Sequence, residues 1–139
     1  MEIQRHSNIV PMGVQHMTAS DLVINGHLIP ANTRVLAVFA EVMKGDYWCE
    51  GEMFRPDRFL DDAGQVKRDA RLIPFSVGKR ACPGEHLARA ELFLFMASLL
   101  QTFNFEAEDL ARPPPVKRMM GLTAMPVPFR VKITRNITE

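Results

Sequence analysis

The stretch that decides the fold is Leu72-Ile73-Pro74-Phe75-Ser76-Val77-Gly78-Lys79-Arg80-Ala81-Cys82-Pro83-Gly84-Glu85. It places Cys82 just before a long apolar segment that predicts a helix. Pro83 suits the first helical position, because its missing N–H would be unpaired there in any case. The free amides of the first turn then point toward the sulfur, and together with the helix dipole they favour negative charge on it. The stretch therefore predicts a cysteine thiolate at the start of a helix.

The surroundings of this cysteine leave three kinds of site open. Gly78 and Gly84 lack side chains, so a bulky flat group has room to approach the backbone. Cys82 fits an inert core thiol, a nucleophile with His86 one turn along as its base, or the sole axial ligand of a haem. Zinc fits poorly, because it takes four ligands and neither Cys49 nor the histidines show paired spacing.

The segment from Gly84 to Phe103 gives the one long helical signal, with apolar residues over most of its circumference. A helix of this kind is typical of the interior of a larger body. Only short hairpins and loops are available to cover it, so we expect a fragment. The apolar positions are Leu87, Leu92, Phe93, Leu94, Phe95, Met96, Leu99 and Leu100.

The remaining elements are short. Residues 1–6 are compatible with a helix that Pro11 ends. Asn25-Gly26 predicts a tight hairpin between residues 22–24 and 27–29. Residues 34–42 fit strand then helix, residues 46–67 are rich in turns, and residues 129–134 alternate as a final strand. The predicted class is mainly α with small β hairpins (α+β).

Composition excludes several function classes. The chain has 139 residues, 47% of them apolar, and a net charge of +1, which gives no electrostatic reason to expect nucleic acid or an anionic membrane as partner. Two cysteines cannot supply a disulfide scaffold. The longest apolar run, residues 92–100, is half of the about 20 residues that a spanning helix needs, and no signal region follows Met1.

The run from Phe75 to Gly84 resembles the haem-binding signature of the cytochrome P-450 family: Phe, two residues, Gly, one, Arg, one, Cys, one, Gly. Two more motifs resemble the family in the expected order, Glu2-Ile3-Gln4-Arg5 (E-x-x-R) and Phe54-Arg55-Pro56-Asp57-Arg58-Phe59 (P-E/D-R-F). The continuation to residue 95 is most similar to the animal microsomal branch. The resemblance covers essentially the whole chain but only the C-terminal part of the family's fold, so residues 1–139 are expected to be a single incomplete domain.

The resemblance implies a cofactor, haem b (iron protoporphyrin IX), with iron ligated by the Cys82 thiolate. It implies that Arg80 and His16 each reach a haem propionate. Phe75 would pack near the sulfur. Gly78 and Gly84 complete the implied haem-binding set.

Glu2 and Arg5 lie three residues apart, on one helical face. An exposed pair of this kind contributes about 0.2–0.5 kcal/mol. The resemblance instead implies a partly buried network with Arg58, which fixes the loop on the cysteine side of the haem and has no catalytic role.

The resemblance also implies a substrate and partners. Methionine adapts to varied shapes, so a lipophilic substrate is expected. The parent enzyme would insert one oxygen atom from O2 into it, with electrons from an NADPH-dependent flavoprotein reductase that Lys79 and Arg89 help to dock. The implied location is the cytoplasmic face of the endoplasmic reticulum membrane, through an N-terminal anchor outside this chain. The implied substrate contacts are Val10, Met12, Gly13, Val14, Met120 and Leu122, with Ile9, Met119, Gly121 and Thr123 beside them.

Two other functions remain open at this stage. One is a truncated, non-catalytic chain from an incomplete gene model, which at most binds haem or a partner. The other is isomerase or lyase chemistry on peroxides with the same thiolate. The sequence departs from the family pattern at Lys44-Gly45, Cys49 and Gly51.

Overall fold

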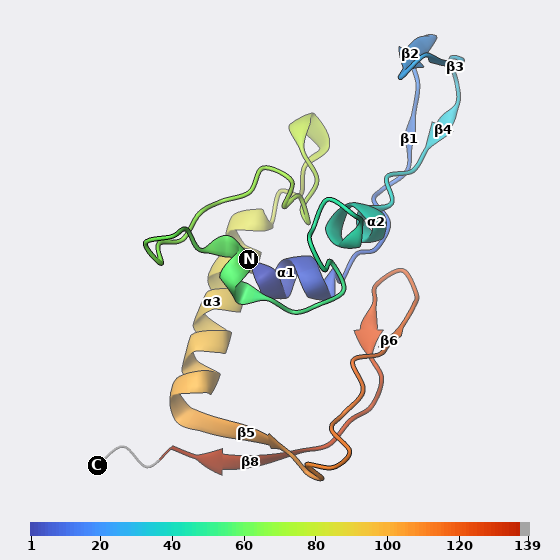
Figure 1. The fold of residues 1–139 in the computed structure, drawn as a ribbon. Helices are drawn as coiled ribbons and strands as arrows, with labels where there is room; N and C mark the ends of the chain where they lie inside the picture. The colour runs from blue at the N-terminus through green and yellow to red at the C-terminus, as the bar shows by residue number, and fades with distance from the viewer. Residues whose placement is uncertain (137–139) are drawn as a thin grey trace. The chain divides into compact units, whose positions relative to one another are not determined.

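The computed structural model describes residues 1–136 and divides into two compact units (Figure 1). The first unit holds residues 1–76 and 120–124, and the second holds residues 77–119 and those from 125 onward. Both combine short antiparallel strand pairs with helices or single 3-10 turns, which confirms the predicted α+β class.

Three helical elements surround the core of the first unit: α1 (Glu2–Ser7), α2 (Phe39–Lys44) and the 3-10 turn η1 (Pro56–Phe59). Helix α1 ends at Asn8, a left-handed residue with φ 37° whose N–H donates to the Gln4 carbonyl. The helix therefore stops before the expected proline, because a left-handed residue ends it first. The buried apolar side chains of the unit are Phe39, Met43, Trp48, Phe59 and Ala124.

Two strand pairs complete the first unit. Strand β1 (His16–Met17) pairs with β4 (Arg34–Val35), and β2 (Leu22–Ile24) pairs with β3 (His27–Ile29), all antiparallel. Asn25 and Gly26 have φ angles of 50° and 80°, as a hairpin turn of this length requires. The predicted hairpin is confirmed, and the ambiguous segment after it is a short strand followed by α2.

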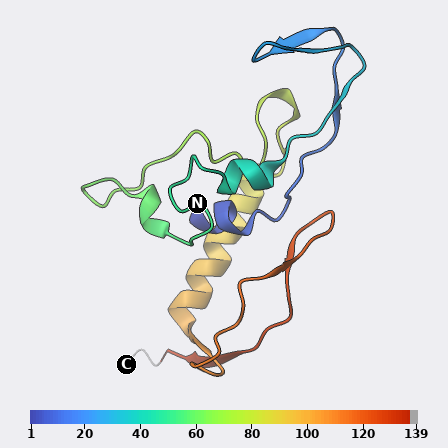
Figure 2. The ribbon, with the colours of Figure 1, turned by 45° about the vertical axis from the view of Figure 1, so that its right-hand side comes forward.

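The second unit is built on one long helix. The 3-10 turn η2 (Gly78–Arg80) precedes α3 (Glu85–Thr102), which runs directly into β5 (Phe103–Ala107), as Figure 2 shows. Strand β5 pairs with β8 (Val131–Arg135), and β6 (Arg118–Met119) pairs with β7 (Met125–Pro126). The predicted helix and final strand are confirmed. Strand β5 was not predicted, because its start was assigned to the helix.

Helix α3 has apolar side chains on all sides, as expected, but none of its residues is buried. Phe93 and Phe95 expose 72% and 66% of their surface. The prediction that α3 lies inside a larger body than this chain stays a prediction. Among these residues, no helix combines the length and apolar character needed to cross a membrane.

Candidate functional site

The loop that carries Cys82 enters α3 through a tight turn. The N–H of Glu85 donates to the Cys82 carbonyl at 3.5 Å, and Gly84 has φ −89° and ψ 7°, the values of the third residue of a type I turn. Pro83 therefore occupies the second position of this turn, where its fixed φ is favoured. Two expectations were wrong: Pro83 is not the first helical residue, and the Glu85 amide meets the carbonyl of Cys82 rather than its sulfur.

The loop leaves its thiol accessible. Cys82 is exposed and free, and a Cβ at Gly84 would lie 3.8 Å from its Sγ. Gly78 has φ +76°, a conformation that L side chains rarely adopt, and nothing lies within 4 Å of a Cβ built there. Within residues 1–136, no three or more His, Cys, Asp and Glu side chains gather into a metal-binding group. The local chemistry is therefore that of a single accessible sulfur ligand.

The other residues expected around a haem fall in both units. Arg80 is exposed in η2 of the second unit. Phe75, half-buried, and His16, exposed in β1 opposite Val35, belong to the first unit. The structure thus gathers Gly78, Arg80, Cys82 and Gly84 along one loop, as the sequence order requires.

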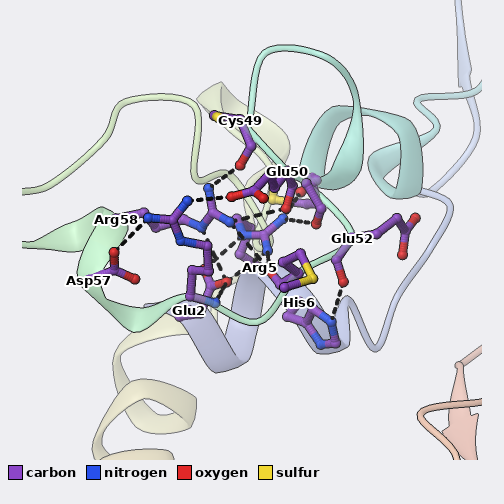
Figure 3. Close-up of polar contacts among 12 residues, drawn as sticks. Glu2, Arg5, His6, Cys49, Glu50, Glu52, Asp57 and Arg58 are labelled. Carbon is purple, nitrogen blue, oxygen red and sulfur yellow. Dashed lines mark hydrogen bonds and ion pairs between the residues drawn. The ribbon is translucent and has the colours of Figure 1, made fainter.

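The structure brings Glu2, Arg5 and Arg58 together in one buried network (Figure 3). Arg5 is fully buried and Glu2 is 4% exposed. Arg5 Nε and Nη2 donate to the two carboxylate oxygens of Glu2 at 2.7 and 2.8 Å, a bidentate pair. Arg58 Nε reaches Glu2 Oε1 at 3.3 Å.

The guanidinium of Arg5 also holds three backbone carbonyls. Its Nη1 donates to the carbonyls of Met43 and Gly51 at 2.6 and 2.7 Å, and its Nη2 to that of Met53 at 3.0 Å. The carbon Cζ of Arg5 lies 5.4 Å from the Trp48 ring centroid. Every charge-bearing nitrogen of the buried cation therefore has an acceptor, which is the condition for keeping such a charge out of water.

Arg58 binds the same loop from the other side. Its Nη1 donates to the Cys49 carbonyl at 2.8 Å, and its Nη2 to those of Glu50 and Met53 at 3.2 and 3.3 Å. Together with Arg5 it fixes most of the 49–53 loop by its carbonyl groups.

The network sets the ionisation of Glu2. Burial alone would raise the pKa of this carboxyl group. The hydrogen bonds from Arg5 and from the Arg55 N–H (2.8 Å), with the charges of Arg5 and Arg58, outweigh burial and lower the pKa below its ordinary value. Glu2 is therefore a carboxylate at neutral pH.

The two expected substrate-contact stretches meet in the first unit. The Ala124 N–H donates to the Ile9 carbonyl at 2.7 Å, which ties residues 120–124 to the segment after α1. The Gly13 N–H donates to the Ala37 carbonyl at 2.8 Å, and a Cβ at Gly13 would lie 3.2 Å from the Phe39 ring. The side chains at these positions are mostly exposed: Val10 41%, Met12 48%, Val14 72%, Met120 66% and Leu122 91%.

Sequence patterns missed several members of the network. Trp48, the carbonyls of Met43 and Gly51, and the Arg55 N–H carry no motif that marks them as partners of Glu2 and Arg5. Backbone acceptors have no sequence signature. The one available signal was Trp48 itself, because it is the single tryptophan of the sequence and large aromatic side chains are highly buried on average.

Comparison with known proteins agrees with this arrangement. The family model described as Cytochrome P450 matches residues 1–133. The chain therefore belongs to the cytochrome P450 family.

Among its relatives, the chain is similar to human "Cytochrome P450 2U1", with 41% identity over 98% of this chain and 25% of the relative. It is similar to "Cytochrome P450 18a1" of Drosophila melanogaster, with 39% identity over 98% of the chain and 26% of the relative. It is also similar to "Farnesoate epoxidase" of Bombyx mori, with 37% identity over 94% of the chain and 27% of the relative. The chain spans about a quarter of the length of the curated relatives it matches.

Proposed function

We propose that this chain is the C-terminal haem-binding portion of a cytochrome P450 monooxygenase and that Cys82 ligates the iron of haem b. The observation that carries the proposal is the exposed free thiol of Cys82 in a loop opened by Gly78 and Gly84. Family membership over residues 1–133 supports it. The activity of the whole protein would be insertion of one oxygen atom from O2 into a lipophilic substrate.

The residues present fit a haem. One sulfur ligand suffices for a haem iron, whereas zinc needs four donors, which do not gather within residues 1–136. Gly84 keeps the space beside the sulfur free of a side chain. Arg80 in η2 and His16 in β1 are the cationic or polar groups proposed for the two propionates.

When bound, a thiolate-ligated haem supplies oxygen activation, because the sulfur pushes electron density onto the metal and favours O–O cleavage. This chain's own residues hold and protect that ligand. Phe75 is proposed to pack near the sulfur and exclude water from it. Glu2, Arg5 and Arg58 are proposed to fix the backbone beneath the site, as scaffold residues.

The substrate is proposed to be lipophilic. Ile9, Val10, Met12 and Val14 form one apolar stretch, and Met120 and Leu122 another, joined by the Ala124 to Ile9 hydrogen bond. The apolar side chains offer contact area but few polar groups that would fix orientation. This favours a ligand recognised by shape and hydrophobicity.

The proposed electron donor is an NADPH-dependent flavoprotein reductase, docked in part through Lys79 and Arg89. Lys79 is exposed beside Arg80, and Arg89 forms an i,i+4 ion pair with Glu85 at 2.7 Å. The proposed location is the cytoplasmic face of the endoplasmic reticulum membrane. These partners rest on family membership.

The deciding experiment replaces Cys82 by Ala and by His in the full-length protein that carries this chain. We expect loss of the reduced-carbonyl absorption band typical of thiolate-ligated haem in both variants, and loss of turnover. Cys49→Ala is the matched control, because that thiol is also exposed and free. An unchanged spectrum in the Cys82 variants would refute the ligand assignment.

A second candidate is a truncated, non-catalytic chain, and the uncovered apolar surface of α3 favours it. The two candidates differ in the coding sequence. An in-frame extension upstream of Met1 that continues the α1 region favours the monooxygenase, and a stop codon there in the mature transcript favours the truncated chain.

A further inference from the structure

Arg71 lies in the loop between η1 and η2, and its contacts have no counterpart among the family motifs. Its Nε and Nη2 donate to Asp69 Oδ1 and Oδ2 at 2.7 and 2.6 Å, so the guanidinium is held flat by a bidentate pair. Its Cζ lies over the Tyr47 ring and 6.0 Å from the Trp48 centroid. A cation held in this way stacks on aromatic rings without losing its hydrogen bonds.

The loop around Arg71 consists of two consecutive turns. The Leu72 N–H donates to the Asp69 carbonyl at 3.1 Å, and the Ser76 N–H donates to the Ile73 carbonyl at 3.0 Å. The Arg71 N–H also donates to Asp69 Oδ1 at 2.9 Å. These bonds lie within the two turns, and the Arg71 side chain adds contacts to Tyr47 and Trp48.

Both aromatic partners of Arg71 belong to the same unit, Trp48 in its core and Tyr47 with 47% of its surface exposed. Trp48 is 5% exposed, packs against Phe59 at 5.7 Å between ring centroids, and donates from Nε1 to the Val42 carbonyl at 2.8 Å. The Arg5 guanidinium also lies near this ring, 5.4 Å from its centroid. Arg71 therefore connects the loop that contains Phe75 with the rings of Tyr47 and Trp48. The buried network lies beside the Trp48 ring.

We propose that Arg71 is a positioning residue for residues 72–76, the segment that leads into the Cys82 loop. By packing over the Tyr47 ring and near Trp48 while paired with Asp69, it holds residues 72–76 in place, Phe75 among them. This inference rests on the proposed function for its spectroscopic consequence, but the anchoring itself depends only on contacts within the first unit.

The test compares Arg71→Ala with Arg68→Ala in the full-length haem protein. Arg68 is an exposed cation three residues earlier in the same loop. The first readout is hydrogen exchange of the Leu72, Ile73, Phe75 and Ser76 amides in the haem-free protein. We expect exchange about tenfold faster in Arg71→Ala, because a local opening becomes easier, and unchanged exchange in Arg68→Ala.

The second readout is the haem itself. In Arg71→Ala we expect a shifted reduction potential and a larger fraction of carbonyl complex that has lost the thiolate-type band. Arg71→Lys should partly rescue both, because lysine keeps the charge but cannot form the bidentate pair with Asp69. Tyr47→Leu removes the ring at similar volume and should reproduce the effect if Arg71→Ala fails to fold.

The outcomes separate this proposal from the proposed function. Equal exchange and equal potentials in Arg71→Ala, Tyr47→Leu and the unsubstituted protein would overturn the positioning role, and so would an unprotected 72–76 loop in the unsubstituted protein. A missing thiolate-type band in the unsubstituted protein would overturn the haem ligand assignment, while the exchange measurement would still decide whether Arg71 anchors the loop.

Discussion

Arg5 Nη1 donates to the carbonyl oxygen of Gly51, 46 residues further along the chain, at 2.7 Å. The same nitrogen donates to the Met43 carbonyl, so one guanidinium joins the end of α2 to the 49–53 loop. Since Arg5 is fully buried, this junction depends on a charge that only its hydrogen-bond partners keep stable.

Replacing Arg5 should be severe. Arg5→Met keeps much of the volume but leaves the Glu2 carboxylate without its bidentate partner, and we expect a loss of about 3–5 kcal/mol in the free energy of unfolding. The measurement is urea denaturation of the full-length protein followed by circular dichroism. Arg34→Met, at an exposed position in β4, is the matched control. A loss no larger than in the control would show that the network does not stabilise the fold.

The network should also impose an acid limit on stability. The pKa of Glu2 in the folded protein lies below its ordinary 4.5, so its contribution is fully present above about pH 4.5 and is lost as pH falls through the folded pKa. Glu2→Gln should flatten the decline in stability between about pH 5 and pH 3. Thermal midpoints measured across this range provide the test.

Asp57→Asn is the control for that measurement, because the hydrogen bond and charge of Arg55 lower the pKa of the exposed Asp57 as well. Exposure weakens the contribution of Asp57 through solvent screening, so the thermal midpoint of this variant should still fall with decreasing pH almost as steeply as that of the unsubstituted protein. If the thermal midpoint of Glu2→Gln falls with pH as steeply as that of the unsubstituted protein, another carboxyl group must cause the loss of stability in acid.

Gly51 should tolerate no side chain. A Cβ there would lie 2.0 Å from the Lys44 carbonyl oxygen, and this atom belongs to the backbone at the end of α2. We expect Gly51→Ala to cost about 1–3 kcal/mol by overpacking and to loosen the carbonyl that Arg5 binds. Gly64→Ala isolates backbone strain, because Gly64 has φ +74° and open space around its Cβ. Equal losses in the two variants would rule out the steric cause.

The isolated 139-residue polypeptide should fold poorly and retain haem weakly. Leu87, Phe93, Leu94 and Phe95 on α3 each expose more than half of their surface, and exposed apolar area on one helix promotes self-association. Light scattering and a haem titration provide the measurements. A monomeric chain with a sharp thiolate-type reduced-carbonyl band would contradict the prediction.

Local sequence signals predicted the elements whose conformation is decided locally. Asn25-Gly26 forms its hairpin because both residues accept positive φ, and α3 begins and ends within one residue of the predicted bounds. Strand β5 escaped prediction because Phe103 continues the apolar pattern of the helix, and only pairing with β8 makes it a strand. Pro83 was misplaced because its fixed φ suits both a helix start and the second position of a type I turn.

The site divides in the same way. Spacing placed Glu2 and Arg5 on one helical face, and the family resemblance added Arg58. The carbonyls that complete the network come from residues 43–53, and no pattern of side chains predicts which backbone carbonyl accepts a hydrogen bond. Arg71 was not predicted because its partners, Tyr47 and Trp48, lie more than twenty residues earlier and meet it only in the folded unit.

The two exposed thiols, Cys49 and Cys82, provide a way to measure how much of the protein holds haem. Cys49 and Cys82 are both exposed, and the Arg58 bond to Cys49 uses its backbone carbonyl, not its thiol. An alkylating reagent should therefore label two sulfhydryl groups before haem loading and only Cys49 afterwards. Mass spectrometry of the labelled peptides would then report the fraction of chains that hold haem, without any optical signal.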